Sequence, residues 1–199
     1  MWALIEDGSI TKHLRGNRGI TIGDTQYSRN IFSFRWSNEE REAIGLYEVV
    51  FNNTKKKDEE YYINTNQSFA FADGTVTASY GDATAKAHAD TLYTAQDESD
   101  GLGTEGEVKI EGLKTKKIRN IKLQAASELA NTDWYIVRKA DADTSVPSAI
   151  TNHRAAVRTK CASMETAITN ASNTAAIETL YTRDADGVRP LGELPTLEV

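Results

Sequence analysis

The stretch NTDWYIVRKADADTSVP, residues Asn131 to Pro147, separates two helical patterns and decides how the second half of the chain folds. It combines a Trp-Tyr pair with a proline that suits the first turn of the following helix, where a missing amide hydrogen costs nothing. A connector of this kind allows the two flanking helices to fold back on one another. The sequence therefore predicts an antiparallel helical hairpin in the second half of the chain.

Apolar residues recur at spacings of three and four on both sides of this connector, which places them on one face of each helix. A third, shorter helix is expected over residues 174–181, with Ile177 and Leu180 facing the pair. The single cysteine, Cys161, excludes an intrachain disulfide and is predicted to be a small buried residue rather than a nucleophile. The apolar positions are Ile118, Ile121, Ala125 and Leu129 before the connector, and Val157, Cys161, Met164, Ile168 and Ala171 after it.

The connector itself admits two interpretations. Trp134 either closes the open end of the helical hairpin or serves as an aromatic anchor for a partner subunit. In addition, a bidentate Arg138 that binds Asp133 or a backbone carbonyl would lock the corner. His153, next to Arg154, is predicted on the surface of the helix that follows. The sequence alone does not separate the two roles of Trp134.

The first half of the chain has the pattern of short strands joined by tight turns. Three dipeptides of aspartate and glycine stand between apolar runs, and they favour two-residue hairpin turns because glycine tolerates a positive φ. Three hairpins predict an antiparallel sheet up to Tyr80 and leave open a barrel, a sandwich or a single sheet with a helix on one face. The dipeptides are Asp7-Gly8, Gly23-Asp24 and Asp73-Gly74.

One helix interrupts these strands. Ser37 is its predicted N-cap, Glu40 completes a capping box, and Gly45 ends it in the left-handed conformation. A strand over residues 46–52 follows, and then a charged, solvated loop over residues 53–60.

The pattern changes after Tyr80. The alanine-rich segment 82–96, with Asp82 as a candidate N-cap, predicts a helix. The acidic, glycine-rich segment that follows it is expected to be a flexible linker between modules. We therefore predict an α+β chain. Its parts are an antiparallel β-rich module with one short helix (1–96), the linker (97–108), a hairpin or three-helix module (109–182) and an extended carboxyl-terminal arm (183–199).

Candidate ligand sites are weak. Residues 97–105 resemble a calcium loop, but the glycine comes one residue early and the loop is too short for a terminal bidentate glutamate. The histidines lack the spacing of a zinc site or a catalytic dyad. The sequence therefore predicts no catalytic residue, no cofactor and no metal. The oxygen ligands of the loop are Asp97, Ser99, Asp100 and Glu105, and the histidines are His13, His88 and His153.

Six basic residues crowd the expected start of the first long helix. They form either an electrostatic dock for an acidic partner or a solvated face opposite Ile118 and Ile121. The net charge of -6 argues against nucleic-acid binding by the whole chain. Membrane insertion and secretion are not expected, because the sequence lacks a run of about 18 apolar residues and a signal-like start. The six are Lys109, Lys114, Lys116, Lys117, Arg119 and Lys122.

Several segments resemble proteins of tailed bacteriophages. ALIEDGSIT near the amino end and LYEVVFNNTKKKDEEYY after the first helix resemble the opening of tail fibre and tail fibre assembly proteins. LANTDWYIVRKADADTSVPSAITNHRAAVR, Leu129 to Arg158, is similar to the phage tail assembly chaperone motif. That motif has a Thr-Asp-Trp-Tyr run, a later arginine, and a proline before a helix with two arginines. The matching positions are Thr132, Asp133, Trp134, Tyr135, Arg138, Pro147, Arg154 and Arg158.

The resemblance implies a phage particle or its assembly. The first hypothesis is a non-enzymatic structural protein of the virion tail, a fibre, adaptor or baseplate-associated homo-oligomer that is made in the host cytoplasm and binds other tail or fibre proteins. The alternative is a tail or tail-fibre assembly chaperone that is absent from the mature particle. A third candidate, a host-envelope hydrolase, needs a carboxylate pair better held than the acids of the linker. The predicted interaction residues are Asp133, Trp134, Tyr135, Arg138, Pro147, Arg154 and Arg158.

Overall fold

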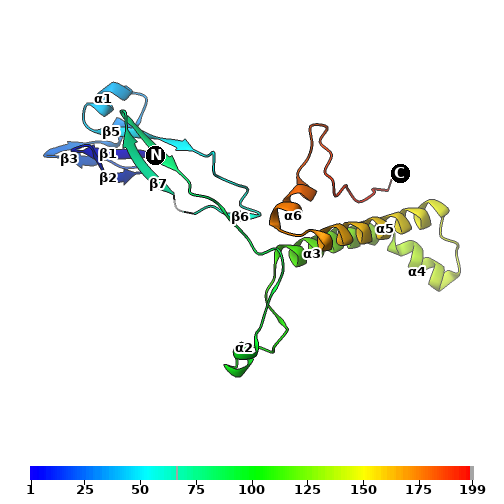
Figure 1. Cartoon of the computed structure of the whole chain (residues 1–199). Helices are drawn as coiled ribbons and strands as arrows, with labels where there is room; N and C mark the ends of the chain where they lie inside the picture. Colours follow the sequence, from blue (N-terminus) through cyan, green and yellow to red (C-terminus); the bar gives the residue numbers. More distant parts are fainter. Residues whose placement is uncertain (66, 198–199) are drawn as a thin grey trace. The chain divides into compact units, whose positions relative to one another are not determined.

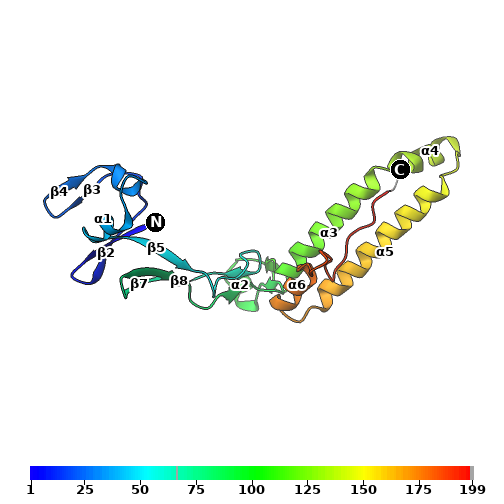
Figure 2. The same ribbon diagram turned by 90° about the horizontal axis from the view of Figure 1, so that it is seen from above.

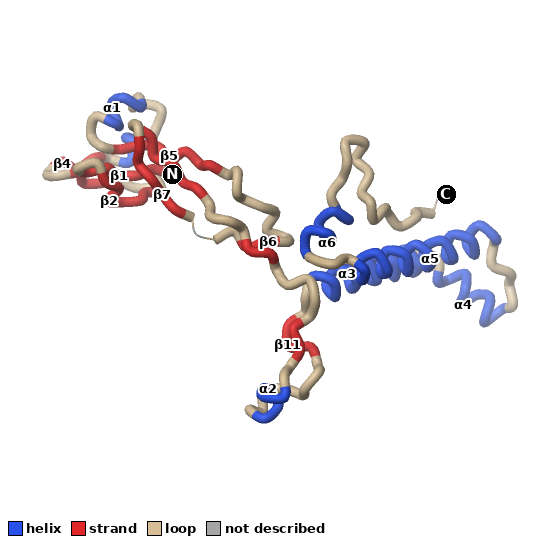
Figure 3. Tube along the Cα trace, in the orientation of Figure 1, coloured by secondary structure: helices blue, strands red, loops and turns tan. Residues whose placement is uncertain are grey.

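The computed structural model describes residues 1–65 and 67–197, which fold into two compact units, Met1–Thr84 and Ala85–Val199. Strands dominate the first unit and long helices the second, so the predicted α+β class is confirmed (Figure 1, Figure 3). The units divide after Thr84, whereas the sequence placed the change of module at residues 97–108. The boundary lies earlier because the chain from Ala85 onward forms hydrogen bonds with the start of the first long helix and therefore belongs to the second unit.

A five-stranded sheet with the strand order β2-β1-β5-β8-β7 is the framework of the first unit. Neighbouring strands are antiparallel as predicted, except that β5 and β8 run parallel with Val49 opposite Val76. This pair is parallel because the chain runs along β7 and turns back before it enters β8 beside β5. The strands are β1 (Trp2–Glu6), β2 (Ser9–Leu14), β5 (Leu46–Asn52), β7 (Ser68–Ala72) and β8 (Thr75–Ser79).

The three predicted hairpin turns are present. Asp7 and Gly8, between β1 and β2, have φ angles of 49° and 75°. Positive φ at both central residues is the geometry of a type I′ turn, whose twist matches that of the flanking strands. The turn between β7 and β8 has the same left-handed pair, and the third turn joins β3 (Ile20–Ile22) to β4 (Thr25–Tyr27) in a separate ribbon.

The five-stranded sheet has an apolar cluster on each face, because successive side chains of a strand point to opposite sides. Ala3 and Val49 belong to one cluster, and Leu4 and Leu46 belong to the other. The second cluster also contains Ile31 from the 3-10 helix η1 (Arg29–Phe32).

The two edge strands of the sheet approach each other. The ring centroids of His13 on β2 and Phe69 on β7 are 4.2 Å apart. Since β2 and β7 stand at opposite ends of the strand order, this contact requires the sheet to curl around the cluster of Ala3 and Val49. Of the architectures that the sequence left open, the structure has a curled single sheet.

Helix α1 (Asn38–Glu42) begins as predicted, but it ends at Glu42 with Ala43 as its C-cap, before the Gly45 that was predicted to end it. The Ser37 hydroxyl accepts the Glu40 amide hydrogen at 3.1 Å, and the Glu40 carboxylate accepts the Ser37 amide hydrogen at 2.8 Å. Gly45 has a φ of 79° and closes the turn into β5. Arg41 is buried, donates from Nε to the Ile31 carbonyl at 2.7 Å, and so fastens α1 to η1.

A charged loop over residues 53–60 follows β5, as predicted, and it is exposed throughout. Lys55 pairs with Asp82 at 3.0 Å and Lys56 with Glu59 at 3.1 Å. Two short strands complete the region, β6 (Tyr62–Ile63) and β9 (Thr84–Ala85).

The prediction of a helix over residues 82–96 is wrong. This segment contains the strands β9 and β10 (Thr91–Leu92), and only its last two residues belong to a helix, α2 (Ala95–Ser99). The carbonyl groups of Ala87 and His88 accept the amide hydrogens of Leu113 and Lys114, each at 3.0 Å. The segment therefore bonds to the start of the next long helix, and this pairing overrides the helix propensity of its alanines.

The acidic segment that was predicted to be a flexible linker is folded. Strand β10 pairs with β11 (Val108–Ile110), and α2 stands at the end of this ribbon. A capping box of Thr94 and Asp97 starts α2, and the amide of Leu102 donates to the Asp97 carbonyl at 2.9 Å. With Gly101 at a φ of 71°, this is a Schellman ending. We call residues 97–107 the acidic tip.

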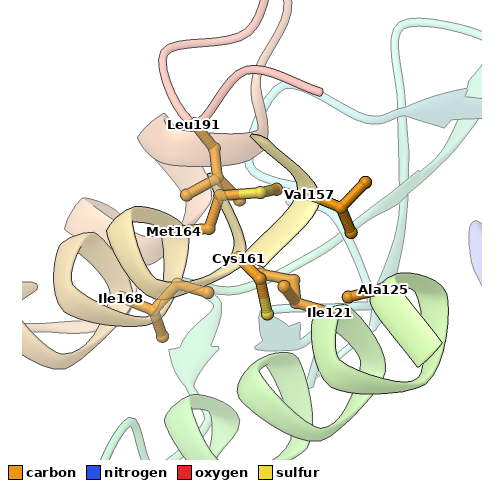
Figure 4. Close-up of a cluster of buried hydrophobic side chains, with 7 residues drawn as sticks. All are labelled: Ile121, Ala125, Val157, Cys161, Met164, Ile168 and Leu191. Carbon is orange, nitrogen blue, oxygen red and sulfur yellow. The ribbon is translucent and has the colours of Figure 1, made fainter. Parts of the chain in front are cut away.

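The predicted helical hairpin consists of α3 (Leu113–Ala130) and α5 (Ser148–Asn170), which lie antiparallel (Figure 2). The two predicted apolar faces meet between the helices, and Cys161 is buried among them as expected (Figure 4). Helix α6 (Thr174–Tyr181) has the predicted bounds, with Ile177 fully buried. The central cluster is Ile121, Ala125, Val157, Cys161, Met164, Ile168 and Leu191.

Leu191 in this cluster belongs to the carboxyl-terminal arm, which was predicted to be extended. The arm lacks regular structure, as predicted, but Leu191 is only 3% exposed and its amide donates to the Leu180 carbonyl at 3.0 Å. Lys160 Nζ donates to the Leu191 carbonyl at 2.9 Å. The arm packs on its own helices because its leucines complete their core; residues 198–199 of the predicted arm lie outside the described residues.

Replacing Leu191 with alanine is expected to lower the free energy of unfolding of the second unit by about 2–3 kcal/mol, because a buried leucine leaves a cavity. Urea unfolding followed by far-ultraviolet circular dichroism measures this change. The matched control is Val188→Ala, since Val188 is exposed in the same arm and should change stability by less than about 0.5 kcal/mol. Equal stabilities of the two variants would mean that the arm is not part of the core.

Candidate functional site: the α4 corner

Residues 131–147, which we call the α4 corner, contain a helix that the sequence did not predict, α4 (Asp133–Ala142). It lies at the end of the α3–α5 hairpin, beside α3 (Figure 2). Every side chain of α4 is at least partly exposed. The helix ends at Asp143, whose φ of 48° is left-handed. Such a helix owes its position to anchoring at its first residues, since it has no buried face of its own.

Arg154 of α5 supplies this anchor. Its Nη1 donates to the Leu129 carbonyl at 2.7 Å and to the Thr132 hydroxyl at 2.6 Å, and its Nη2 pairs with Asp133 at 2.8 Å. Arg154 is buried and Thr132 is almost fully buried. One guanidinium thus joins the end of α3, the start of α4 and the second turn of α5.

Two sequence predictions need correction here. His153 was expected on the helix surface but is partly buried. Its neighbour Arg154 points towards the interhelical corner, where carbonyl, hydroxyl and carboxylate oxygens compensate its charge. Arg138 was expected to bind Asp133 or a backbone carbonyl, but Arg154 is the partner of both kinds of group. Arg138 lies one helical turn beyond Trp134, and its guanidinium stacks on aromatic rings instead.

Trp134 does not close the hairpin, because 52% of its surface is exposed. Its ring centroid is 3.8 Å from that of Tyr135, with an interplanar angle of 33°. The guanidinium carbon of Arg138 lies 4.7 Å from the Trp134 ring and 5.5 Å from the Tyr135 ring. The three side chains form one exposed stack, whose cation–π contacts hold Arg138 over the rings.

The apolar surface of α4 extends beyond the stack. Ile136 is 44% exposed and Val137 is 65% exposed. Pro147 precedes the first residue of α5, as predicted, with φ -57° and ψ 139°. Arg158 is exposed one turn beyond Arg154 on α5. The structure thus joins Asp133 to Arg154 and gathers the aromatic stack, while Pro147 and Arg158 lie outside both groups of contacts.

Thr132 is a residue of this corner that the prediction of interaction residues left out. Its hydroxyl accepts from Arg154 Nη1 and donates to the Leu129 carbonyl at 2.9 Å. A threonine directly before an acidic residue is a common signal of a helix start, and this signal was available in the sequence.

The basic run at the start of α3 is engaged inside the second unit. Lys109 pairs with Asp97 at 2.6 Å, Arg119 with Glu111 at 2.5 Å, and Lys122 with Glu165 at 3.1 Å. In addition, Lys114 donates to the Thr169 carbonyl, and Lys117 lies over the Tyr181 ring. These contacts satisfy much of the positive charge, so the run is neither a plain solvated face nor an open dock.

The ion pair of Lys109 predicts a pH effect. Bonds to Lys109 and to Thr94 lower the pKa of Asp97 from 3.8 to about 2. Because the folded pKa lies below the unfolded one, this stabilisation is complete above about pH 4 and is lost as the pH falls towards 2. In Asp97→Asn, the melting temperature should start lower at pH 6 and fall less between pH 4 and pH 2 than in the wild type.

Calorimetry between pH 6 and pH 2 measures this difference, with Glu107→Gln on the same tip as the control. If Asp97→Asn and Glu107→Gln had the same dependence of melting temperature on pH, the role of the Lys109–Asp97 pair would be contradicted.

Among the described residues there is no group of three or more His, Cys, Asp or Glu side chains arranged to hold a metal ion. No helix within residues 1–65 or 67–197 is long and apolar enough to span a membrane. No protein-family model, no curated protein and no solved structure matches this chain. The interpretation of the α4 corner therefore rests on its own geometry.

Proposed function

We propose that this chain is a non-enzymatic structural protein of a bacteriophage tail and acts through protein–protein contacts, with the α4 corner as a contact surface. The exposed stack of Trp134, Tyr135 and Arg138 is the observation that carries this proposal. Tryptophan, tyrosine and arginine are the residues that most often dominate the energy of protein interfaces. The resemblance of Leu129 to Arg158 to a phage tail assembly motif supplies the context.

The corner is also rigid enough for this role. The stack follows directly after Asp133, which Arg154 holds in place. Side chains that are fixed before binding lose little conformational entropy when a partner arrives, so affinity improves without new contacts. Arg154 is therefore a positioning residue, and Trp134 is the contact residue.

The first test is peptide mass spectrometry of gradient-purified particles, with the copy number measured against the major capsid protein. A constant, stoichiometric copy number is expected for a building block of the tail. Absence from particles together with abundance in the lysate would overturn the structural role. It would favour the second candidate, an assembly chaperone, which the similarity of residues 129–158 to the chaperone motif also supports.

The α4 corner is tested separately by replacing Trp134 with alanine. Because the ring is half exposed, the isolated chain should lose less than about 1 kcal/mol of stability. Incorporation into particles in a complementation assay should fall at least tenfold if the ring is an interface anchor. Leu123→Ala is the matched control, since Leu123 is an exposed apolar residue of α3 away from the corner. Normal incorporation of Trp134→Ala would remove the corner from the interface.

A further inference from the structure

A basic cleft lies in the first unit, in the loop between β2 and β3. It has a volume of about 440 Å³, and its lining includes Lys12, His13, Arg15, Arg18 and Phe32. An adjoining hollow of about 310 Å³ shares Gly16, Asn17 and Phe32 with it and adds Arg29. We call the two together the basic cleft. Residues 9–37, which precede helix α1, contain a single acidic residue, Asp24. Their lysines and arginines are Lys12, Arg15, Arg18, Arg29 and Arg35.

Two glycines fix the shape of this cleft. Gly16 has a φ of 73°, and a Cβ there would lie 3.1 Å from the ring of Trp2. A Cβ on Gly19 would overlap the carbonyl oxygen of Tyr27. Because both glycines pack this tightly, the loop that carries Arg15 and Arg18 is held in shape before any ligand binds.

The positive charge of the cleft is uncompensated within the described residues. Arg15, Arg18 and Arg29 are exposed, and none of them has an ion-pair partner in the described part of the chain. Like charges that line one cleft raise the local potential and attract an anionic ligand. The partly buried ring of Phe32 lies in the lining beside these charges. The ligand that fits such a surface is acidic at its rim and apolar at its centre.

The acidic tip of the second unit has this composition. Residues 97–107 contain five acids and no lysine or arginine, and Leu102 stands among them 58% exposed. The tip is also closely packed, because a Cβ on Gly103 would lie 2.6 Å from the Tyr93 ring. Lys109 engages Asp97, whereas Glu98, Asp100, Glu105 and Glu107 remain exposed.

We propose that the basic cleft of one copy of this chain binds the acidic tip of a second copy. Opposite charges meet at the rim, and Leu102 meets the ring of Phe32, which is the usual arrangement of an apolar centre inside a polar border. The cleft and the tip are different surfaces, so the contact is head-to-tail and builds rings or open chains rather than a two-fold dimer. This contact does not involve the α4 corner. An experiment that disproves it would therefore leave the proposed function unaffected.

The expected strength follows from the exposure of the charges. Exposed pairs are screened over about 8–10 Å at ionic strengths of 0.1–0.15 M, so the association should be strong at low salt and weaken as salt is added. A tip in a cleft buries less surface than a permanent subunit interface, which predicts a reversible contact. The diagnostic property is therefore self-association that falls with salt.

The experiment is sedimentation velocity of the full chain over a concentration series at low and at high salt, with two charge-reversal variants. Arg15→Glu with Arg18→Glu removes the net positive charge of the cleft, and Glu105→Lys with Glu107→Lys removes most of the net negative charge of the tip. None of these four side chains has a bond in the described contacts, so folding should be retained and is checked by circular dichroism.

Each variant alone should sediment as a monomer at concentrations where the wild type associates. An equimolar mixture of the two should associate again, because the unchanged acidic tip of the cleft variant meets the unchanged basic cleft of the tip variant. Lys55→Glu with Lys57→Glu is the matched control, since it changes the net charge of the first unit equally but lies in the loop over residues 53–60. This control should associate like the wild type.

A wild-type chain that stays monomeric at low salt would overturn the proposal, and so would variants that associate normally or a mixture that stays monomeric. A titration with inorganic polyphosphate tests the alternative that the cleft binds a polyanion rather than a second copy. If polyphosphate binds to the Arg15 and Arg18 cleft while the wild type alone remains monomeric, the cleft belongs to a polyanion and not to a second copy.

Discussion

Replacing Arg154 with methionine is expected to lower the free energy of unfolding of the helical unit by about 3 kcal/mol. The methionine fills most of the space but leaves the Leu129 carbonyl and the Thr132 hydroxyl without their charged donor. Buried polar groups that lose their partners cost about 1–3 kcal/mol each, and breaking a buried charge network costs 3–5. The value lies at the lower end because Asp133 is exposed and regains water. Urea unfolding of the full chain, followed by circular dichroism, measures it.

The control for this variant is Arg158→Met, one turn further along α5 and exposed. It should change stability by less than about 0.5 kcal/mol. Arg154→Lys should lie between the two, because one ammonium group cannot reach three acceptors in the geometry of a guanidinium. If Arg154→Met and Arg158→Met were equally stable, the anchoring of α4 by Arg154 would be wrong.

Replacing Gly45 with alanine is expected to destabilise the first unit by about 3 kcal/mol. Its φ of 79° is left-handed, which costs a residue with a side chain about 1–2 kcal/mol. A Cβ would also overlap the backbone oxygen of Ile5, whose amide donates to the Gly45 carbonyl at 2.7 Å. Since backbone cannot rotate away like a side chain, β1 and β5 must shift at their junction, which adds about 1–3 kcal/mol.

Gly8→Ala separates these two contributions. Gly8 has a φ of 75°, but no atom lies within 4 Å of its added Cβ. It should therefore show the conformational cost alone, about 1 kcal/mol. Thermal unfolding followed by tryptophan fluorescence suits both variants, because Trp2 and Trp36 are half-buried in this unit. Equal losses would mean that the overlap at Ile5 relaxes freely.

Local signals predicted the parts of the fold that depend on neighbours in sequence. The dipeptides at residues 7–8 and 73–74 specify hairpin turns because their backbone needs positive φ. Ser37 and Glu40 specify a helix start because they exchange hydrogen bonds across one turn. The periodic apolar residues of α3 and α5 specify the hairpin because their faces must be buried against each other.

The features that were not predicted from the sequence depend on contacts between residues far apart in the chain. Alanine-rich residues 82–96 have the propensity of a helix, but Ala87 and His88 bond instead to the start of α3. Leu191 is buried against helices that precede it in the chain. The carboxyl-terminal arm has prolines and no apolar periodicity, so its sequence does not indicate this burial. The helix over residues 82–96 was predicted wrongly and the burial of Leu191 was not predicted, because local preference does not report tertiary pairing.

The candidate site was predicted in composition but not in geometry. The motif placed Asp133, Trp134 and Arg154 in one neighbourhood, and the structure brings the first and the last into an ion pair. Which of the arginines turns inward depends on the rotation of α5 about its axis, and a spacing pattern does not specify this rotation for a polar residue. The exposure of Trp134 was not predicted either, because the sequence did not indicate α4, a helix without a buried side chain.

The parallel pairing of β5 and β8 has a consequence for synthesis on the ribosome. When β5 emerges, β1 is ready to pair with it, but its other neighbour is translated only after residues 53–74. During this interval one edge of β5 is open, and Val49 and Phe51 lie along it without their strand partner. Open, apolar strand edges are the sites where nascent chains join each other wrongly. A shortened chain that ends before β8 keeps this edge permanently and should aggregate, so any dissection of the first unit must retain Ser79.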